Sequence, residues 1–504
     1  MNERVEQTKI NQAVWGACDS FRGVVDPSIY KDYVLTMLFL KYISDVWQDH
    51  YDQYEKKHGD HPELIEELLK SERFVLPKDA SFYALHEKRF EAGNGERIDK
   101  ALHAIEEANI HKLRDVFQDI TFNSTRLGDE AQKNDILRHV LEDFNRPELN
   151  LRPSRIGKLD IIGNAYEFLI KNFAATSGKK AGEFYTPPEV SELIAELVSP
   201  DEGAEICDPA CGSGSLLMKC GRQVQAKFNG SRKYALYGQE AIGSTWALAK
   251  MNMFLHGEDN HRIEWGDTIR NPKLLDTEDT LKHFDVVVAN PPFSLEKWGQ
   301  EKAQTDKFGR FRRGVPPKTK GDYAFVLHMV ETLKPKKGRM AVVVPHGVLF
   351  RGAAEGKIRQ RLLEENLVDA VIGLPEKLFY GTGIPAAILL VRRDKKDKSV
   401  LFIDASRDFH PGKNQNQLTE ASIAKVVEAY GARKPIDKYA HLATFDEIKA
   451  NDFNLNIPRY VDTFEQEEEI DLRAVLAERA VLKAELIELE AKMDGYLKEL
   501  GYGS

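Results

Sequence analysis

The pattern of apolar positions divides the chain into a helical first part, a middle part of alternating strands and helices, and a helical end. Residues 1 to about 150 repeat apolar side chains at helical spacing and contain no convincing strand. A helix is expected to begin at Asp26-Pro27, because an acidic cap and a proline both suit a first turn. Its wide apolar face is formed by Tyr30, Tyr33, Val34, Met37, Leu38, Leu40, Tyr42 and Ile43. Further helices are expected near 63–74, 97–109 and 130–144. Nothing in this part pairs a nucleophile with a base, so a plain packing domain is the simpler interpretation.

From residue 204 to about 393, short apolar runs alternate with helical patterns, which is typical of a doubly wound, mostly parallel α/β sheet. The runs predict a seven-stranded sheet with strands at 204–207, 234–238, 262–265, 284–289, 340–344, 368–373 and 386–391. Helices over 155–173 and 189–198 precede them, and 399–403 is a candidate for one more edge strand. We therefore predict an all-helical domain at 1–150, an α/β domain at 151–400 and a C-terminal region at 401–504.

The last forty or so residues carry apolar side chains at alternating spacings of three and four, which is the heptad pattern of a helix that packs against another helix. The positions are Val475, Leu482, Leu486, Leu489, Met493, Tyr496 and Leu500, interrupted by Arg479. Such a helix needs a partner. Either a second protein or the helical domain of this chain fits the pattern.

Composition narrows the class of protein. The chain has 504 residues and a net charge of −9, which argues against binding nucleic acid by bulk charge, so any DNA contact must be local or shared with a more basic partner. No apolar run approaches a membrane span, and the start MNERVEQTKI is too polar for a signal peptide. The four cysteines lack the pairing of zinc ligands, and a reducing cytoplasm is the expected compartment.

Unusual polar motifs follow the predicted strands, where ligands of such sheets bind. After the first strand comes the run Asp208-Pro209-Ala210-Cys211-Gly212-Ser213-Gly214-Ser215, in which small residues allow close approach of a ligand. Glu240 ends the second strand, in a position to hold ribose hydroxyls, and Asp267 follows the third. A dinucleotide would also suit a glycine loop with a ribose acid. The loop lacks the G-x-G-x-x-G spacing, however, and a nucleoside without phosphates fits better.

The fourth strand ends in Asn290-Pro291-Pro292-Phe293, which we interpret as the active site. The prolines remove N–H donors, so the carbonyl groups of the turn act only as acceptors. Together with the Asn290 side chain and the Phe293 ring they suit a planar substrate with an exocyclic NH2 group. The plain alternative is a strand exit with a capping asparagine and a core phenylalanine.

Two neighbouring segments carry further candidates. The run Gly182-Glu183-Phe184-Tyr185-Thr186-Pro187-Pro188 leads into a helix whose N-terminus would attract a carboxylate. After Phe293, residues 294–321 are rich in lysine, arginine and aromatic residues, which suits contact with DNA phosphates and bases. A merely solvated, mobile loop is the alternative.

Taken together, these motifs resemble those of the modification (M) subunits of Type I restriction-modification systems, which are DNA N6-adenine methyltransferases that use S-adenosylmethionine. The resemblance covers essentially the whole length and includes the helix Ala249-Lys250-Met251-Asn252-Met253-Phe254-Leu255-His256-Gly257. It implies a Rossmann-like methyltransferase sheet with a helical N-terminal domain and a C-terminal helical tail. It implies Asn290, Pro291, Pro292 and Phe293 as catalytic residues and no metal. The cofactor residues that it implies are Glu183, Phe184, Tyr185, Thr186, Pro187, Pro188, Asp208, Gly212, Ser213, Gly214, Ser215, Glu240 and Asp267.

The resemblance also implies roles and partners. Thr186 would meet the methionine carboxylate of the cofactor, Asp208 its ammonium or sulfonium side, Glu240 the ribose and Asp267 the adenine amine. The target adenine would flip out of double-stranded DNA and stack on Phe293. The chain has no room for major-groove readout and no Walker A loop. A separate DNA-specificity (S) subunit and a restriction/translocase (R) subunit are therefore expected partners, with two M subunits for each S subunit.

Three other functions are compatible with parts of the pattern. A protein glutamine side chain also offers a planar NH2 group, although such enzymes are shorter and favour tyrosine after the two prolines. N4-cytosine methylation is possible, but a serine in place of Asn290 would be more typical. The chain could also be a non-catalytic scaffold that only binds cofactor.

Overall fold

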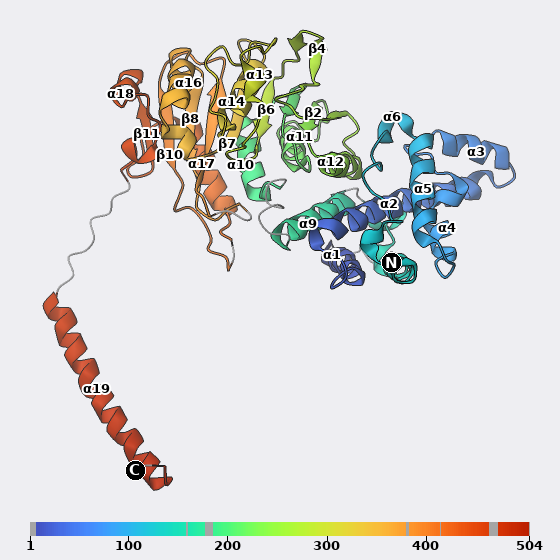
Figure 1. The fold of residues 1–504 in the computed structure, drawn as a ribbon, viewed down its shortest axis with the longest axis horizontal. Coiled ribbons are helices and arrows are strands. Elements are labelled where there is room, and N and C mark those ends of the chain that lie inside the picture. Colours follow the sequence, from blue (N-terminus) through green and yellow to red (C-terminus); the bar gives the residue numbers. More distant parts are fainter. Residues whose placement is uncertain are drawn as a thin grey trace. The chain divides into compact units, whose positions relative to one another are not determined.

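A computed structural model describes residues 7–157, 160–176, 185–379, 383–413, 415–462 and 472–502 (Figure 1). The chain forms two compact units, Met1–Val461 and Asp462–Ser504. The expected domain divisions at residues 150 and 400 stay predictions.

The first part is helical, as predicted. It contains α1 (Gln7–Gly16), α2 (Pro27–His58), α3 (Pro62–Lys70), α4 (Phe82–Glu87), α5 (Asn94–Ala108), α6 (Ile110–Leu113), α7 (Glu130–Phe144), α8 (Pro153–Ile156) and α9 (Asp160–Thr176). The carboxylate of Asp26 accepts the Ser28 N–H at 2.8 Å, so α2 begins with the predicted cap. All eight apolar residues of the predicted α2 face are buried, which confirms that face.

A buried ion pair fastens the end of this helical part to α2. Lys41 and Asp45 lie one turn apart on α2, and both side chains are almost fully buried. Asp45 also accepts hydrogen bonds from the Tyr83 hydroxyl and, at 2.7 Å, from the Leu151 N–H. Burial lowers the pKa of Lys41, although the charge of Asp45 opposes this shift. Removing the carboxylate would leave a buried ammonium and a buried N–H without their partner.

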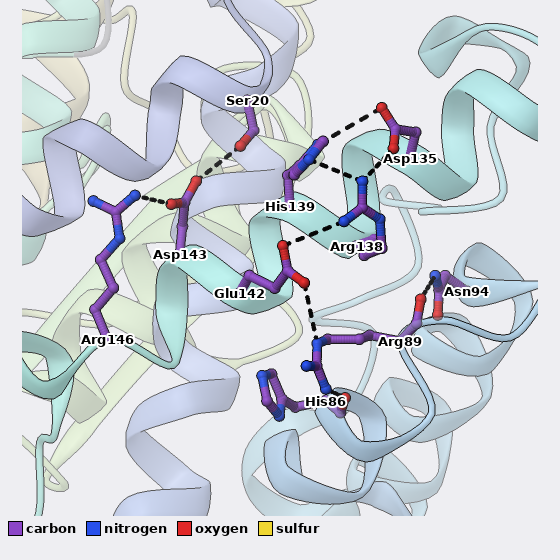
Figure 2. Close-up of polar contacts among 10 residues, drawn as sticks. All are labelled: Ser20, His86, Arg89, Asn94, Asp135, Arg138, His139, Glu142, Asp143 and Arg146. Carbon is purple, nitrogen blue, oxygen red and sulfur yellow. Dashed lines mark hydrogen bonds and ion pairs between the residues drawn. The ribbon is translucent and has the colours of Figure 1, made fainter.

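A second polar network joins α7 to the end of α4 on the surface (Figure 2). Arg138 lies between Asp135, at 2.6 Å, and Glu142, at 3.5 Å, and Glu142 reaches Arg89 at 3.3 Å. The Asp135 side chain is 60% exposed, so water screens these charges. Such exposed pairs contribute little to stability.

The α/β part is built on one nine-stranded sheet in the order β11-β10-β8-β9-β7-β6-β1-β2-β3 (Figure 1). The strands are β1 (Glu205–Asp208), β2 (Ala235–Glu240), β3 (His261–Trp265), β6 (Val286–Ala289), β7 (Arg339–Pro345), β8 (Val368–Gly373), β9 (Ala386–Arg392), β10 (Val400–Asp404) and β11 (Ala440–Ala443). All seven predicted strands are present. Pairing is parallel except for β9 with its two neighbours and β11 with β10, so the predicted fold class is confirmed.

The predicted strand number of seven is wrong, because β10 and β11 extend the sheet. The candidate edge strand at 399–403 is an inner strand, paired with β8 on one side and β11 on the other. Four consecutive residues of β10 are buried, as expected of an inner strand. Strand β11, Ala-His-Leu-Ala, is too short and too polar to stand out as an apolar run.

Helices cover both faces of this sheet. They are α10 (Pro188–Val198), α11 (Ser215–Lys227), α12 (Gly243–Leu255), α14 (Asp322–Glu331), α15 (Gly347–Phe350), α16 (Ala353–Glu364), α17 (Glu420–Ala432) and α18 (Phe445–Ala450). A small hairpin of β4 (Leu275–Thr277) and β5 (Thr280–Leu281) and the short helix α13 (Gln300–Ala303) complete this part. On β6, Val286 and Val288 belong to one apolar core and Val287 and Ala289 to the other. This strand is therefore buried on both sides, as its run of valines predicts.

The second unit contains the helix α19 (Leu472–Glu499). The heptad positions from Val475 to Leu500 are all exposed, each by 47% or more. Among the described residues no helix has the length and apolar character that a bilayer crossing requires.

The two polar networks predict very different effects of losing one carboxylate. We expect Asp45→Asn to lower the free energy of unfolding by about 3–5 kcal/mol, because it leaves a buried charge unpaired. Asp135→Asn on the surface of α7 is the matched control and should leave the free energy of unfolding nearly unchanged, because water screens that charge. Urea denaturation followed by tryptophan fluorescence measures both, and equal losses would contradict the role given to the buried pair.

Candidate active site

Strand β6 ends where the Asn-Pro-Pro-Phe turn begins. The side-chain amide nitrogen of Asn290 donates a hydrogen bond to the Thr186 hydroxyl at 3.1 Å. The amide oxygen of Asn290 is buried and has no hydrogen-bond partner among the described residues. Pro291 is buried, and Pro292 and Phe293 are half-buried. Because a proline has no N–H group, the two residues that follow Asn290 cannot donate to this oxygen.

The glycine loop after β1 is held in a shape that requires its glycines. Gly212 and Gly214 have φ angles of +53° and +79°, in the left-handed region. A Cβ atom on Gly214 would also lie 2.7 Å from the methyl group of Met253. Helix α11 begins directly afterwards at Ser215, whose hydroxyl is hydrogen-bonded to that of Ser213 at 2.9 Å.

The glycine loop and the Asn290 turn meet in one pocket. Strands β1 and β6 are parallel neighbours, so Asp208 and Asn290 leave the sheet at the same edge. The pocket between them is lined by Thr186, Asp208, Ala210, Cys211, Gly212, Ser213, Ser215, Leu216 and Asn290. Segments that are about 80 and 100 residues apart in the sequence therefore form one site. The positions of Asp208 and Asn290 after predicted strands indicate this, whereas Thr186 lies before α10 and follows no predicted strand.

Two further predicted acids lie at the ends of the neighbouring strands and are not among the residues that line this pocket. Glu240 accepts the Gly212 N–H at 3.0 Å and, through its other oxygen, the Ile242 N–H at 2.9 Å. It therefore ties the end of β2 to the glycine loop. One oxygen of Asp267 accepts the N–H groups of Ile269 and Arg270, both at 2.9 Å, which caps the turn after β3.

Burial dominates the electrostatics of the pocket. It raises the pKa of Asp208 to about 8; the Ala210 N–H, at 2.9 Å, opposes the shift and the nearby Glu240 adds to it. Burial also raises the pKa of Glu240, against the hydrogen bonds from its backbone partners. Both carboxyl groups would therefore gain from a positively charged or hydrogen-bond-donating ligand.

The segment before α10 is described in part. Glu183 and Phe184 lie outside the described residues. Tyr185 is buried, Thr186 reaches the pocket, and Pro187 and Pro188 begin α10.

One aromatic residue beside the turn was not predicted. The Phe379 ring contacts the Phe293 ring edge to face, with ring centres 5.9 Å apart. Phe379 follows β8, so its place after the carboxyl end of a predicted strand was the available signal.

The prediction for the basic segment 294–321 is wrong in part, because two of its arginines point inward. Arg310 and Arg313 are 3% and 1% exposed. Arg310 pairs with Asp306 at 2.7 Å, and Arg313 with Glu365 at 2.5 Å. The Trp298 ring is buried against Phe311, and its N–H donates to the Pro317 carbonyl at 2.8 Å. This segment is packed around its own core and is not a merely solvated loop.

The exposed cations of the same segment are Lys297, Lys302, Lys307, Arg312 and Lys318. Of these, Lys307 pairs with Asp279 at 3.1 Å and Arg312 pairs with Glu331.

Comparison with known proteins assigns the chain to a family. The N-6 DNA Methylase family model matches residues 157–469, and the HsdM N-terminal domain model matches residues 10–144. The Type I restriction enzyme MjaVIII methylase subunit of Methanocaldococcus jannaschii is 33% identical, over 99% of this chain and 86% of its own length. The MpnII methylase subunit of Mycoplasma pneumoniae is 32% identical, over 94% of this chain and 93% of its own length.

A solved structure agrees with these sequence matches. The crystal structure of a type I restriction-modification system methyltransferase subunit from Streptococcus thermophilus superposes with a TM-score of 0.81 at 36% identity. It covers 91% of this chain and 100% of its own. These matches favour adenine methylation in DNA over the glutamine, cytosine and scaffold alternatives. The chain thus belongs to the N-6 DNA methylase family and is an S-adenosylmethionine-dependent DNA adenine N6-methyltransferase, the modification subunit of a Type I restriction-modification system.

Proposed function

We propose that methyl transfer takes place in the pocket between Asp208 and Asn290, with the Asn290 amide oxygen and the Pro291 carbonyl as acceptors for the adenine N6 amine. The supporting observation is the buried Asn290 oxygen that has no partner in the described structure. A buried polar atom without a hydrogen bond costs about 1–3 kcal/mol. A substrate amine that donates to this oxygen would remove that cost.

Both acceptors would change the reactivity of the amine. The lone pair of an adenine amine is delocalised into the ring, which makes the nitrogen a weak nucleophile. When its hydrogens are held by Asn290 and Pro291, the nitrogen is favoured in a pyramidal form with its lone pair directed at the methyl donor. When bound, S-adenosylmethionine supplies a methyl group on a positively charged sulfur. Asn290 and Pro291 then mainly align the two reacting atoms, about 3–3.5 Å apart.

The cofactor residues follow from the chemistry of their side chains. We assign Asp208 to the positive ammonium or sulfonium side, Glu240 to the ribose hydroxyls and Asp267 to the adenine amine. Thr186 and the start of α10 are assigned to the carboxylate. The other cofactor residues in this proposal are Glu183, Phe184, Tyr185, Pro187, Pro188, Gly212, Ser213, Gly214 and Ser215.

The target base must leave the DNA helix to reach this turn. We assign Phe293 as the ring on which the flipped adenine stacks, with Phe379 holding that ring from its edge. Stacking on an aromatic side chain returns about 1–3 kcal/mol of the cost of unstacking the base.

We assign sequence recognition to a separate DNA-specificity subunit that binds the exposed apolar side chains of α19. In the complete complex, two copies of this chain would serve one specificity subunit beside a restriction/translocase subunit.

The turn itself is tested by transfer of labelled methyl groups to DNA. In the complex with the specificity subunit, we expect Asn290→Ala to lower kcat by about 10²–10³-fold, as loss of a buried hydrogen-bonding group at a reacting centre does elsewhere. Phe293→Ala should cost about tenfold or more through lost stacking. The exposed ring of Phe90 in the helical domain provides the control, Phe90→Ala, with unchanged transfer. Label in protein, or transfer insensitive to both turn variants, would contradict the proposal.

The raised pKa of Asp208 predicts that cofactor binding releases a proton. Below about pH 8 the free carboxyl group is protonated, and a positive ligand favours its ionised form. The Kd for S-adenosylmethionine should therefore fall as pH rises from 6 to 8, by up to about tenfold for each pH unit, and then level off. Calorimetry in buffers of different ionisation enthalpy measures the number of protons that are released when the cofactor binds. Asp208→Asn should bind weakly without this pH dependence, and a wild-type Kd that is constant from pH 6 to 8 would refute the assignment.

The assembly role of α19 is tested by adding charge to its apolar positions. We expect the double variant Leu486→Glu, Leu489→Glu to lose co-purification with the specificity subunit while its cofactor Kd stays unchanged. Glu488→Gln, on an exposed side chain of the same helix, is the control and should assemble normally. Normal assembly of the double variant would show that the contact lies elsewhere.

A further inference from the structure

The packed segment 294–321 touches both halves of the proposed site. We propose that it acts as a brace between the cofactor loops and the target-base turn, with Arg310 of the segment and Asp322, the first residue of α14, as positioning residues. This inference rests on the proposed function, because it concerns the geometry of the same site.

At the target-base end, Asp322 holds the residue that follows Phe293. The Ser294 N–H donates to one Asp322 oxygen at 2.7 Å, and the other oxygen pairs with Arg351 at 2.6 Å. Ser294 has a φ angle of +53°, which a residue with a side chain adopts only when its surroundings hold it there. Asp322 is 3% exposed, so this contact lies away from water. The Asp322 carboxylate therefore fixes the backbone one residue beyond the stacking ring.

The two ends of the segment are also joined to each other. The Gly321 N–H donates to the Leu295 carbonyl at 3.0 Å, beside the contact between Ser294 and Asp322. A Cβ atom on Gly321 would lie 3.1 Å from that carbonyl oxygen, so the close approach depends on glycine. The segment thus closes at the start of α14, next to the catalytic turn.

At the cofactor end, Arg310 holds the loop that carries Asp267. Its buried guanidinium donates to the carbonyls of Thr268 and Ile269 at 3.1 and 2.8 Å. The Thr268 hydroxyl in turn donates to the Pro209 carbonyl, in the glycine loop, at 2.6 Å. Arg310 therefore connects the segment to two of the loops that are proposed to bind the cofactor.

Another arginine of the segment, Arg313, separates a positioning role from ordinary stability. Arg313 is as deeply buried as Arg310, but its ion pairs are with Glu331 and Glu365, on and beside helices α14 and α16. Within the described part of the chain, its side-chain hydrogen bonds go to Glu331 and Glu365 and not to the cofactor loops or the turn. Arg313→Gln is thus a matched control that removes a buried ion pair without touching the site.

The experiment uses the complex with the specificity subunit and DNA in which 2-aminopurine replaces the target adenine. The methylated sequence is first located by sequencing methylated DNA. Flipping of the base raises 2-aminopurine fluorescence. We expect Asp322→Ala to abolish most of this rise and to lower kcat about 10²-fold, with the cofactor Kd within about twofold of wild type. Asp322→Asn keeps one acceptor for the Ser294 N–H and should recover part of both.

Arg310→Gln should show the opposite pattern. The loss of charge-assisted hydrogen bonds to the cofactor loop should raise the Kd for S-adenosylmethionine about tenfold, with the fluorescence rise retained. Arg310→Lys keeps the charge and should bind more tightly than Arg310→Gln. Arg313→Gln should lower Tm but leave both readouts at wild-type values.

These readouts distinguish failure of the brace from failure of the proposed function. If the defects of all three residues simply follow the loss of Tm, or if Asp322→Ala flips the base normally, the brace is refuted. If Asn290→Ala methylates DNA as well as wild type does, the proposed function is refuted instead.

Discussion

The proposed chemistry depends on one hydrogen-bonding group that the fold leaves without a partner. The Asn290 amide is engaged at its nitrogen by Thr186, whereas its buried oxygen has no partner among the described residues. The sequence of the turn helps to keep it so, because the two residues after Asn290 are prolines and lack N–H groups. Thr186 comes from the start of another helix, 104 residues earlier in the chain. The acceptor is therefore created jointly by local turn chemistry and by the packing of α10 against the sheet.

The arrangement follows from parallel strand pairing. Because β1, β2, β3 and β6 run in the same direction, the residues that follow them emerge at one edge of the sheet. This brings the glycine loop, two acids and the Asn-Pro-Pro-Phe turn together without any of them being close in sequence. The loops then contact one another directly, as when Glu240 accepts the Gly212 N–H. The proposed cofactor and target-base sites thus lie at the same edge of the sheet.

The sequence was informative wherever the signal was local. Short apolar runs predict seven of the nine strands of the sheet, and Asp26-Pro27 predicts the start of α2, because strand burial and helix capping depend on neighbouring residues. It was uninformative where the structure depends on distant partners. The basic surroundings of Arg313 in the sequence predict a contact with DNA. In the structure Arg313 instead pairs with Glu365, which lies 52 residues away in the chain. Strand β11 is similar, since its four residues become a strand only because β10 offers them an edge.

The inward-turned arginines also bear on how the chain meets DNA. The net charge is −9, so the basic segment beside the turn is a natural place for phosphate contacts. Arg310 and Arg313 are neutralised inside the protein, and the exposed Arg312 and Lys307 lie against carboxylates of the same chain. Few unpaired cations therefore remain in this segment to attract a polyanion. The segment thus offers a small set of free charges for phosphate contacts, and the proposed DNA-specificity subunit would supply further contacts to the duplex.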